Sequence, residues 1–337
     1  MKKIISLFIS VATLFAMLTI TINCNAAKII YGDTEVIDHV VYKKITENDK
    51  KSNKSITYYS VSSLFDSDDS KKTVKEINIA REINGIPVIK FESFVYDYNE
   101  FPDYENAIVE KISLPNTIKI IDSSAFALLK NLKSINIPES VEYIGSDAFY
   151  NCSSLESIVF PSKVLIINRS VCKKCTSLKK VTFKGKVKSV CSYAFANCTN
   201  LKKLTLPNSV EYFGNCVLQN TKVTRFTLPK KAITKNYPFA STKNLKNVTI
   251  KSFPNTFEYG YFYKCKSLKE VHLESIKKFK DFVVGEEAFK GTKPGIKFYV
   301  RNKKLAKKLY NGLKSRKVKK AKIYVGKKLV YKTKKWL

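Results

Sequence analysis

The strongest constraint on the fold is an internal repeat of about 23 residues that fills most of this 337-residue chain. The segment from Leu132 to Pro138 reads LKSINIP, and its apolar pattern returns in seven further units. The eight units begin at residues 109, 132, 155, 178, 201, 223, 245 and 268, so successive starts lie 22 or 23 residues apart. Such repeats are typical of solenoids, because one unit cannot bury its apolar face alone and must stack on its neighbours.

Each unit has two halves with different expected roles. With Leu132 as position one, the first half carries apolar residues at positions one, four and six, which predicts a strand with one buried face. The second half, exemplified by Val141 to Cys152, holds a Val-x-x-Ile pair that predicts the opposite wall and an Ala-Phe pair that predicts a ring-filled corner. A fainter copy within residues 74–96 brings the array to about nine units.

The pattern Leu-x-x-Ile-x-Ile-Pro-x-Ser-Val-x-x-Ile-Gly-x-x-Ala-Phe-x-x-Cys, intact from Leu132 to Cys152, resembles the BspA-like class of leucine-rich repeats. The resemblance covers residues 74–294. It implies a leucine-rich-repeat solenoid with a parallel β-sheet on one face, a second wall of short strands and turns, short helical corners and a cap at both ends. It also implies a secreted or surface-displayed ligand binder or adhesin.

The regions outside the repeats predict export and two caps. Residues 1–26 have the layout of a secretory signal peptide, with a basic start, an apolar run from Ile4 to Ile22 and small residues before Lys28. An uncleaved membrane anchor is the alternative interpretation. Residues 27–73 predict an N-terminal β cap and residues 295–337 a basic C-terminal cap, since open sheet ends pair with other chains. With no second apolar stretch of about 18 residues, we expect a mature protein without a transmembrane span, secreted and in some cases associated with the cell wall.

The outward face of the predicted strands carries a cationic row. Positions three and five point away from the core because strand side chains alternate. Position three places three cations on consecutive strands, and position five places a threonine beside each. The six candidate ligand-binding residues are Lys180, Lys203, Arg225, Thr182, Thr205 and Thr227. Such a row suits a carboxylate, sulfate or phosphate; the alternative is an ordinary solvated face with threonine chosen for strand propensity.

Charge is concentrated at the C-terminal end. The chain has 61 Lys and Arg against 28 Asp and Glu, a net charge of +33, and residues 291–337 hold 18 basic and no acidic side chains. The candidate polyanion-binding residues are Lys303, Lys304, Lys307, Lys308, Arg316, Lys317, Lys319 and Lys320. Behind a signal peptide, the accessible polyanions are cell-wall polymers, anionic glycans and membrane headgroups rather than nucleic acid. The alternative is a cap that only solubilises the chain.

The sequence offers little for catalysis or metal binding. Four cysteines occupy position 21 of their units: Cys152, Cys175, Cys198 and Cys265. They indicate buried corner residues, with disulfides between adjacent coils left open as an alternative. Cys172 and Cys175 form a C-x-x-C without a second matching pair, and His39 and His272 lie in no motif. We therefore expect no enzyme activity, no metal site and no cofactor.

The sequence hypothesis is a non-catalytic secreted or cell-surface protein that binds proteins or host matrix in adhesion. Its cationic C-terminal cap would associate electrostatically with the envelope. The alternative is a soluble secreted module that binds anionic glycans through the basic strand face. The expected partner is thus a protein or an anionic polysaccharide of the host matrix or cell wall, and not nucleic acid.

Overall fold

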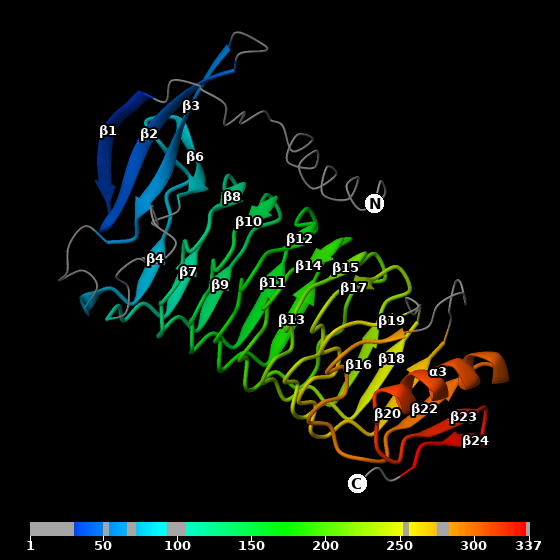
Figure 1. Ribbon diagram of the computed structural model, residues 1–337. Coiled ribbons are helices and arrows are strands. Elements are labelled where there is room, and N and C mark those ends of the chain that lie inside the picture. Colours follow the sequence, from blue (N-terminus) through cyan, green and yellow to red (C-terminus); the bar gives the residue numbers. More distant parts are fainter. Residues whose placement is uncertain are drawn as a thin grey trace.

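The computed structural model describes residues 30–49, 54–65, 72–92, 106–251, 256–274 and 283–334. Its repeat units wind as successive coils along one axis, between a β-sheet at the N-terminal end and a helix with a β-hairpin at the C-terminal end (Figure 1). The prediction of a solenoid with a parallel β-sheet on one face is confirmed: the array is a parallel β-solenoid with little helix. The predicted signal peptide at residues 1–26 lies outside the described residues.

One wall of the solenoid, here called the strand face, comes from the first half of each unit. Its strands in the array are β4 (Glu76–Asn78), β7 (Lys111–Ser113), β9 (Ser134–Asn136), β11 (Ser157–Phe160), β13 (Lys180–Phe183), β16 (Arg225–Leu228), β18 (Asn247–Ile250) and β20 (Glu270–Leu273). Paired strands run parallel, and equivalent positions of successive units lie opposite each other, as Ser157 does to Lys180. The residues at positions three and five therefore form rows along the molecule.

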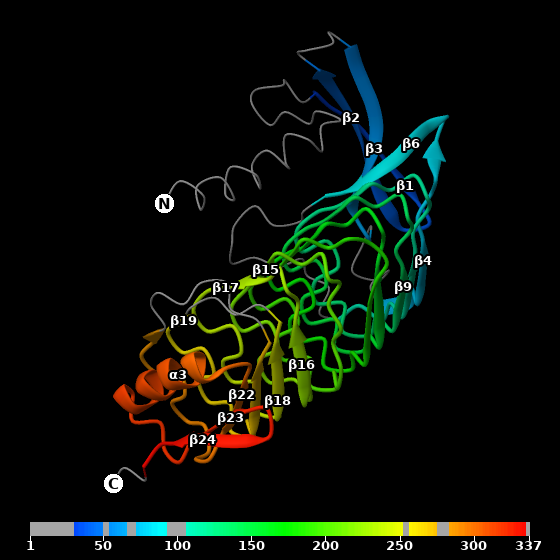
Figure 2. The same cartoon turned by 90° about the vertical axis from the view of Figure 1, so that its right-hand side faces the viewer.

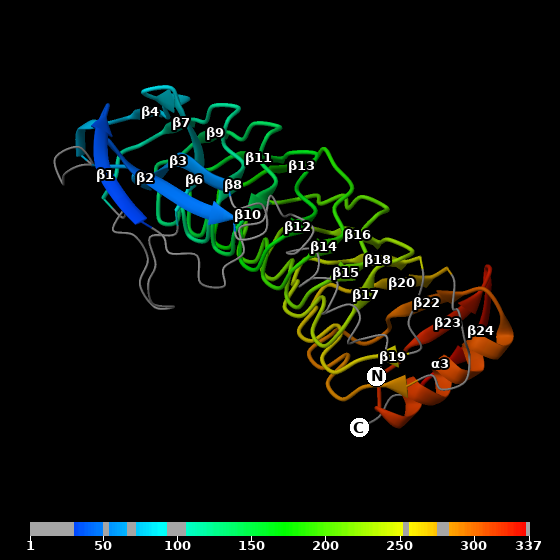
Figure 3. The ribbon, with the colours of Figure 1, turned by 90° about the horizontal axis from the view of Figure 1, so that it is seen from above.

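The second wall consists of two-residue strands from the second half of each unit. These are β8 (Ile120–Ile121), β10 (Tyr143–Ile144), β12 (Ile166–Ile167), β14 (Ser189–Val190), β15 (Tyr212–Phe213), β17 (Ile233–Thr234), β19 (Thr256–Phe257) and β21 (Val283–Val284). They also pair in parallel, so both walls stack along the same axis (Figure 3).

The corners contain hydrogen-bonded turns that form a third ladder between coils. The N–H of Ser170 donates to the carbonyl of Ser192 at 3.0 Å, and that of Cys172 donates to Ala194 at 2.9 Å. Ser170 and Lys174 have φ angles of 53° and 66°, and equivalent residues of the other coils are left-handed too. The left-handed residues are four positions apart, and between them the N–H of every second corner residue donates to the next coil. These bonds satisfy backbone donors where no strand exists.

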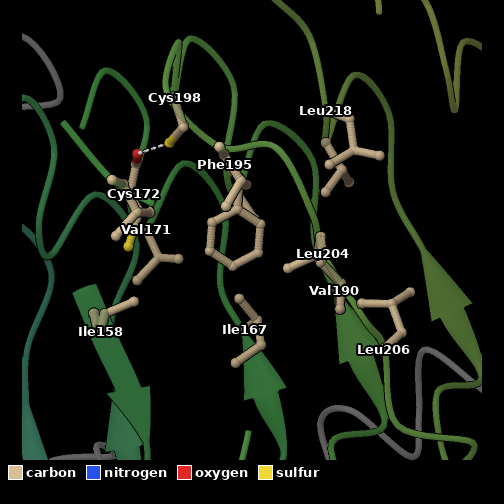
Figure 4. Packing of buried hydrophobic residues seen from close by; sticks show 14 of the residues in the cluster. Ile158, Ile167, Val171, Cys172, Val190, Phe195, Cys198, Leu204, Leu206 and Leu218 are labelled. Atoms are coloured by element: carbon tan, nitrogen blue, oxygen red, sulfur yellow. Dashed lines mark hydrogen bonds between the residues drawn. The ribbon is translucent and has the colours of Figure 1, made fainter. Parts of the chain in front are cut away.

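The core is one continuous column between the two walls. Corner rings stack from coil to coil: Phe126 and Phe149 have centroids 5.4 Å apart and Phe239 and Phe262 likewise 5.4 Å. Figure 4 shows Phe195 among aliphatic side chains of both walls, including Ile158 of the strand face and Ile167 of the second wall. Most coils bury a ring at this corner, as the Ala-Phe pair predicts, whereas Cys172 and Leu218 fill the same position in two coils.

The strand face is not continuous. It divides into the ladders β4-β7-β9, β11-β13 and a third that begins at β16. The first half of the unit that starts at Leu201 has no assigned strand, although Leu204 and Leu206 are buried as the pattern requires. The interruption coincides with a ring cluster, in which Phe183 and Phe195 have centroids 6.4 Å apart.

The two ends extend different walls. At the N-terminal end, the antiparallel strands β1 (Ile30–Ile37), β2 (Val40–Asp49) and β3 (Lys54–Ser63) join the second wall through β6 (Ile86–Phe91), which also forms a hairpin with β5 (Glu82–Ile83). At the C-terminal end, β22 (Lys297–Val300), β23 (Lys322–Val325) and β24 (Lys328–Lys332) extend the strand face. The helix α3 (Lys303–Ser315) packs beside β21 to β24 (Figure 2).

Candidate functional site

The six predicted strand-face residues do not all stand on strands. Lys180 and Thr182 lie on β13, and Arg225 and Thr227 lie on β16. Lys203 and Thr205 lie between these strands, in the first half of the unit that starts at Leu201, which has no assigned strand. The expectation of three consecutive strands is therefore corrected, because the hydrogen-bonded ladder stops after β13 and resumes at β16.

The cations at position three differ from the lysines beside them. At position two, Glu110 pairs with Lys133 at 2.8 Å and Glu156 pairs with Lys179 at 2.9 Å, so carboxylates neutralise these two lysines. Lys180, Lys203 and Arg225 are exposed, and none has an ion-pair partner among the described residues. This part of the strand face therefore presents cations that are available to an anionic ligand. Along the chain, Thr205 and Thr227 alternate with buried core residues and Thr182 alternates with half-buried ones, so the three side chains lie on the same outward side.

The basic C-terminal region is built on an amphipathic helix. Asn302 caps α3 by accepting a hydrogen bond from the N–H of Leu305 at 2.9 Å. The buried residues of the helix are Leu305, Ala306, Leu309 and Leu313. Lys303, Lys304 and Lys307 are exposed, whereas Lys308 is half-buried. The helix thus turns most of its predicted cations away from the core.

Arg316 has a different environment from the other predicted cap cations. Its Nε donates to the carbonyl oxygen of Val284 at 2.8 Å, and its Nη1 lies 3.5 Å from Glu286. These contacts tie the end of α3 to the last coil, beside a cavity of about 390 Å³ that Lys317 and Lys319 also line. Lys317 and Lys320 have left-handed φ angles of 52° in the connection to β23, and Lys317, Lys319 and Lys320 are exposed.

The corner cysteines are structural in this arrangement. The thiol of Cys198 donates to the carbonyl of Cys172 at 3.1 Å (Figure 4), and Cys152, Cys175 and Cys265 make the equivalent bond to the coil before them. All seven described cysteines are free thiols. Burial raises the pKa of Cys152, Cys172 and Cys198 well above the usual value, which keeps these thiols protonated and unreactive. Within the described ranges, His, Cys, Asp and Glu form no group of three or more able to hold a metal ion.

An aromatic row on the strand face went unpredicted. His272 on β20 stacks on Tyr299 of β22, with centroids 4.5 Å apart, and Tyr299 stacks on Tyr324 of β23 at 5.1 Å. The repeat alignment ends with the unit at residue 268, so the repeat pattern places Tyr299 and Tyr324 in the C-terminal cap. The tetrapeptides KFYV at 297–300 and KIYV at 322–325 share the pattern of EVHL at 270–273, and that signal could have placed all three rings in one row.

Comparison with known proteins gives a family and a fold. The family model described as BspA type leucine-rich repeat region matches six copies, over residues 100–220 and 166–295. A search of the curated proteins finds no match. Searched for spanning segments, the described part of the chain contains no helix with the length and apolar character needed to cross a membrane.

Three solved structures are similar to the chain at low identity. A leucine-rich repeat protein from Bacteroides ovatus is 19% identical, with 90% of this chain and 88% of that chain covered and a TM-score of 0.47. The pneumococcal vaccine antigen PcpA is 18% identical, with 88% and 99% covered and a TM-score of 0.43. A leucine-rich cell surface protein from Faecalibacterium prausnitzii is 14% identical, with 88% and 95% covered and a TM-score of 0.40.

Proposed function

The chain belongs to the BspA type leucine-rich repeat family, and from that premise we propose that it is a non-catalytic, secreted or cell-surface protein that binds proteins or host matrix in adhesion. The family match confirms the resemblance carried by Leu132 to Cys152. The observation that carries the proposal is the strand face, on which outward side chains form rows in register within each ladder. Repeat surfaces of this kind suit binding of extended partners.

We further propose that the C-terminal cap holds the protein on the envelope electrostatically after residues 1–26 have directed its export. Support comes from the exposed cations of α3 and of the connection to β23, together with the absence of acidic residues from 291–337. Attraction between exposed charges weakens as added salt shortens the screening length to a few ångströms. The attachment should therefore be reversible by salt.

Fractionation of the native cells tests this attachment. The protein is expected with the envelope at low salt and in the wash at 1 M NaCl, where the screening length falls to about 3 Å. Replacing Lys303, Lys304 and Lys307 by Gln should lower the salt concentration needed for release. Retention in 1 M NaCl, or a protein that never associates with cells, contradicts electrostatic attachment.

A second candidate function is binding of anionic glycans through the basic strand face. Lys180, Lys203 and Arg225 favour it, because no described carboxylate neutralises them, whereas Lys133 and Lys179 at position two are paired. Replacing all three by Ser should abolish retention of acidic sugars on a glycan array. Because all three are exposed, the free energy of unfolding should change by no more than about 1 kcal/mol. Unchanged retention would exclude this site.

A further inference from the structure

The last strands of the strand face carry two adjacent rows of side chains. The aromatic row is His272, Tyr299 and Tyr324, which lie opposite one another in the register of β20, β22 and β23. Their rings are nearly parallel, at 7° and 20°. On β24, Leu329 lies opposite Tyr324 and is 45% exposed. The aromatic row thus runs along the solenoid axis and ends at an exposed apolar side chain.

The second row, here called the lysine row, is Lys297, Lys322 and Lys332. These residues lie directly opposite one another on β22, β23 and β24. Neighbouring strands are about 4.8 Å apart, and like charges directly opposite each other destabilise a sheet. The three strands contribute no acidic residue. The chain therefore keeps an unfavourable charge row at this place, and an anionic partner would relieve it.

Glu270 is the one carboxylate on the four strands β20, β22, β23 and β24, and it lies at the β20 end of the lysine row. It accepts a hydrogen bond from Asn247 Nδ2 at 2.8 Å and lies 3.7 Å from Lys297 Nζ. Lys322 and Lys332 have no ion-pair partner among the described residues. Positive charge is therefore greatest over β23 and β24.

The stacking decides what the rings can offer to a partner. Tyr299 stacks on His272 on one side and on Tyr324 on the other, so both of its faces are closed to an incoming group. What remains outward are ring edges, which are electropositive, and polar ring atoms. Together with the lysine ammonium groups, this surface mainly donates hydrogen bonds and carries positive charge. A complementary partner is anionic and rich in acceptor oxygens.

We propose that the aromatic and lysine rows bind a linear anionic polysaccharide laid along the solenoid axis. Its carboxylate or sulfate groups pair with the lysine row, and its hydroxyls bond to the tyrosine hydroxyls. The rows cross four strands, a length of about 14 Å at the strand spacing, which matches a short oligosaccharide segment. A protein partner would need more open apolar area than the covered rings and Leu329 provide. The proposal rests on the binding role proposed above and adds a separate site for the anionic glycans of the second candidate function.

Charge-matched variants test the lysine row with heparin, a sulfated and carboxylated polysaccharide, as the probe. The site variant replaces Lys297, Lys322 and Lys332 by Gln. The control replaces Lys230, Lys231 and Lys243 by Gln; these three are exposed and lie in neither proposed site. At 150 mM salt the site variant is expected to lose about tenfold in affinity and the control no more than about twofold. Equal losses of heparin affinity in the site and control variants would mean that binding depends only on net charge, which would overturn the proposal.

Two single variants separate binding from structure. Glu270→Gln removes the negative end of the row and frees Lys297, so heparin affinity should rise about threefold, a gain that a purely structural residue would not give. Tyr324→Phe keeps the stack on Tyr299 but removes a hydroxyl, so affinity should fall while the thermal midpoint stays unchanged. A fall in affinity for Glu270→Gln, or no fall for Tyr324→Phe, contradicts the assignment.

The remaining comparisons decide the ligand class. Polygalacturonate, which carries carboxylates alone, should bind with the same sensitivity to the site variant, and neutral dextran should not bind. If poly-L-glutamate binds as tightly as heparin and with the same sensitivity, the partner is an acidic protein segment and the polysaccharide assignment is wrong. If the site variant loses its affinity for heparin but still associates with cells and is released by 1 M NaCl, this inference and the envelope attachment are both supported. If the wild-type protein binds heparin more tightly than the site variant but does not associate with cells, the envelope attachment alone is refuted.

Discussion

Thr242 occupies the corner position at which four other coils carry cysteine. There, the thiols of Cys152, Cys175, Cys198 and Cys265 each donate to a carbonyl of the preceding coil at 2.9–3.1 Å. The hydroxyl of Thr242 is buried and has no hydrogen-bond partner among the described residues. A buried polar atom without a partner costs about 1–3 kcal/mol. One coil of the solenoid is therefore destabilised at this atom.

Replacing Thr242 by Val should stabilise the protein at the residue level. Valine keeps the branched shape and removes the unbonded hydroxyl, so the free energy of unfolding should rise by about 1 kcal/mol. Thr221 provides the matched control, since its hydroxyl donates to the carbonyl of Leu218 at 2.8 Å. Thr221→Val should therefore destabilise by a similar amount. Urea unfolding followed by circular dichroism measures both changes, and a destabilised Thr242→Val variant contradicts the argument.

At the scale of elements, Glu139 connects three successive coils. Its carboxylate accepts hydrogen bonds from the Nζ of Lys184 and from both the N–H and the hydroxyl of Ser162. The bond from Lys184, followed by those from Ser162, lowers the pKa of Glu139 from 4.5 to about 2. Because the folded pKa is the lower one, the stabilisation is complete above the unfolded pKa and is lost as pH falls from about 4.5 to 2.

Glu139→Gln should accordingly reduce thermal stability at pH 6 and have a smaller effect near pH 2. As pH falls toward 2, the wild-type carboxyl becomes protonated and therefore uncharged, like the amide of the glutamine variant. The stabilities of the two proteins should converge there. Thermal midpoints of both proteins measured between pH 2 and pH 6 test this. A constant difference over that range would mean that the ionised carboxylate does not contribute through these contacts.

The repeat pattern predicts most elements, because each apolar position faces the core whatever the neighbouring coils do. Leu201, Leu204 and Leu206 keep that pattern and are buried as expected. Whether the segment hydrogen-bonds as a strand depends instead on the spacing between coils, which no residue within the unit encodes. For the same reason the six candidate strand-face residues could be placed on one face, but not on one continuous sheet. The stack of His272 on Tyr299 joins units 27 residues apart, outside the 23-residue period.

Hydrogen exchange should detect the missing strand. Between Lys202 and Leu206 no described backbone N–H donates a hydrogen bond to the neighbouring coil, whereas the segment from Asn247 to Ile250 is a laddered strand. An amide that makes no hydrogen bond needs less local unfolding before its hydrogen exchanges with solvent. Peptides that cover residues 202–206 should therefore exchange faster than peptides that cover 247–250. Equal protection of the two segments would mean that the ladder continues through this unit.

At the scale of the whole molecule, coupling between coils is uneven. A solenoid unfolds cooperatively only while each coil is bound strongly enough to the next. From Lys180 to Arg225 the strand face is interrupted, and the coils are joined by the second wall, where β14, β15 and β17 stay paired, and by the corner ladder. Phe195 lies in that corner and contacts both Phe160 and Phe183. The junction beside this ring is thus expected to be weak, as is the junction between the units at Leu132 and Leu155, where neither β9 and β11 nor β10 and β12 pair.

Phe195→Ala should separate the solenoid into two unfolding units. Removing a fully buried ring costs about 3–5 kcal/mol, and here that loss falls on a junction whose strand face is unpaired. The matched control is Phe262→Ala, because Phe262 is equally buried but lies where both β18-β20 and β19-β21 are paired. The control should lower the urea midpoint and keep a single transition. Phe195→Ala should give two unfolding transitions. Peptides before residue 183 and peptides after residue 225 should lose hydrogen-exchange protection at different urea concentrations. A single transition for both variants would mean that the second wall and the corners alone couple the two halves.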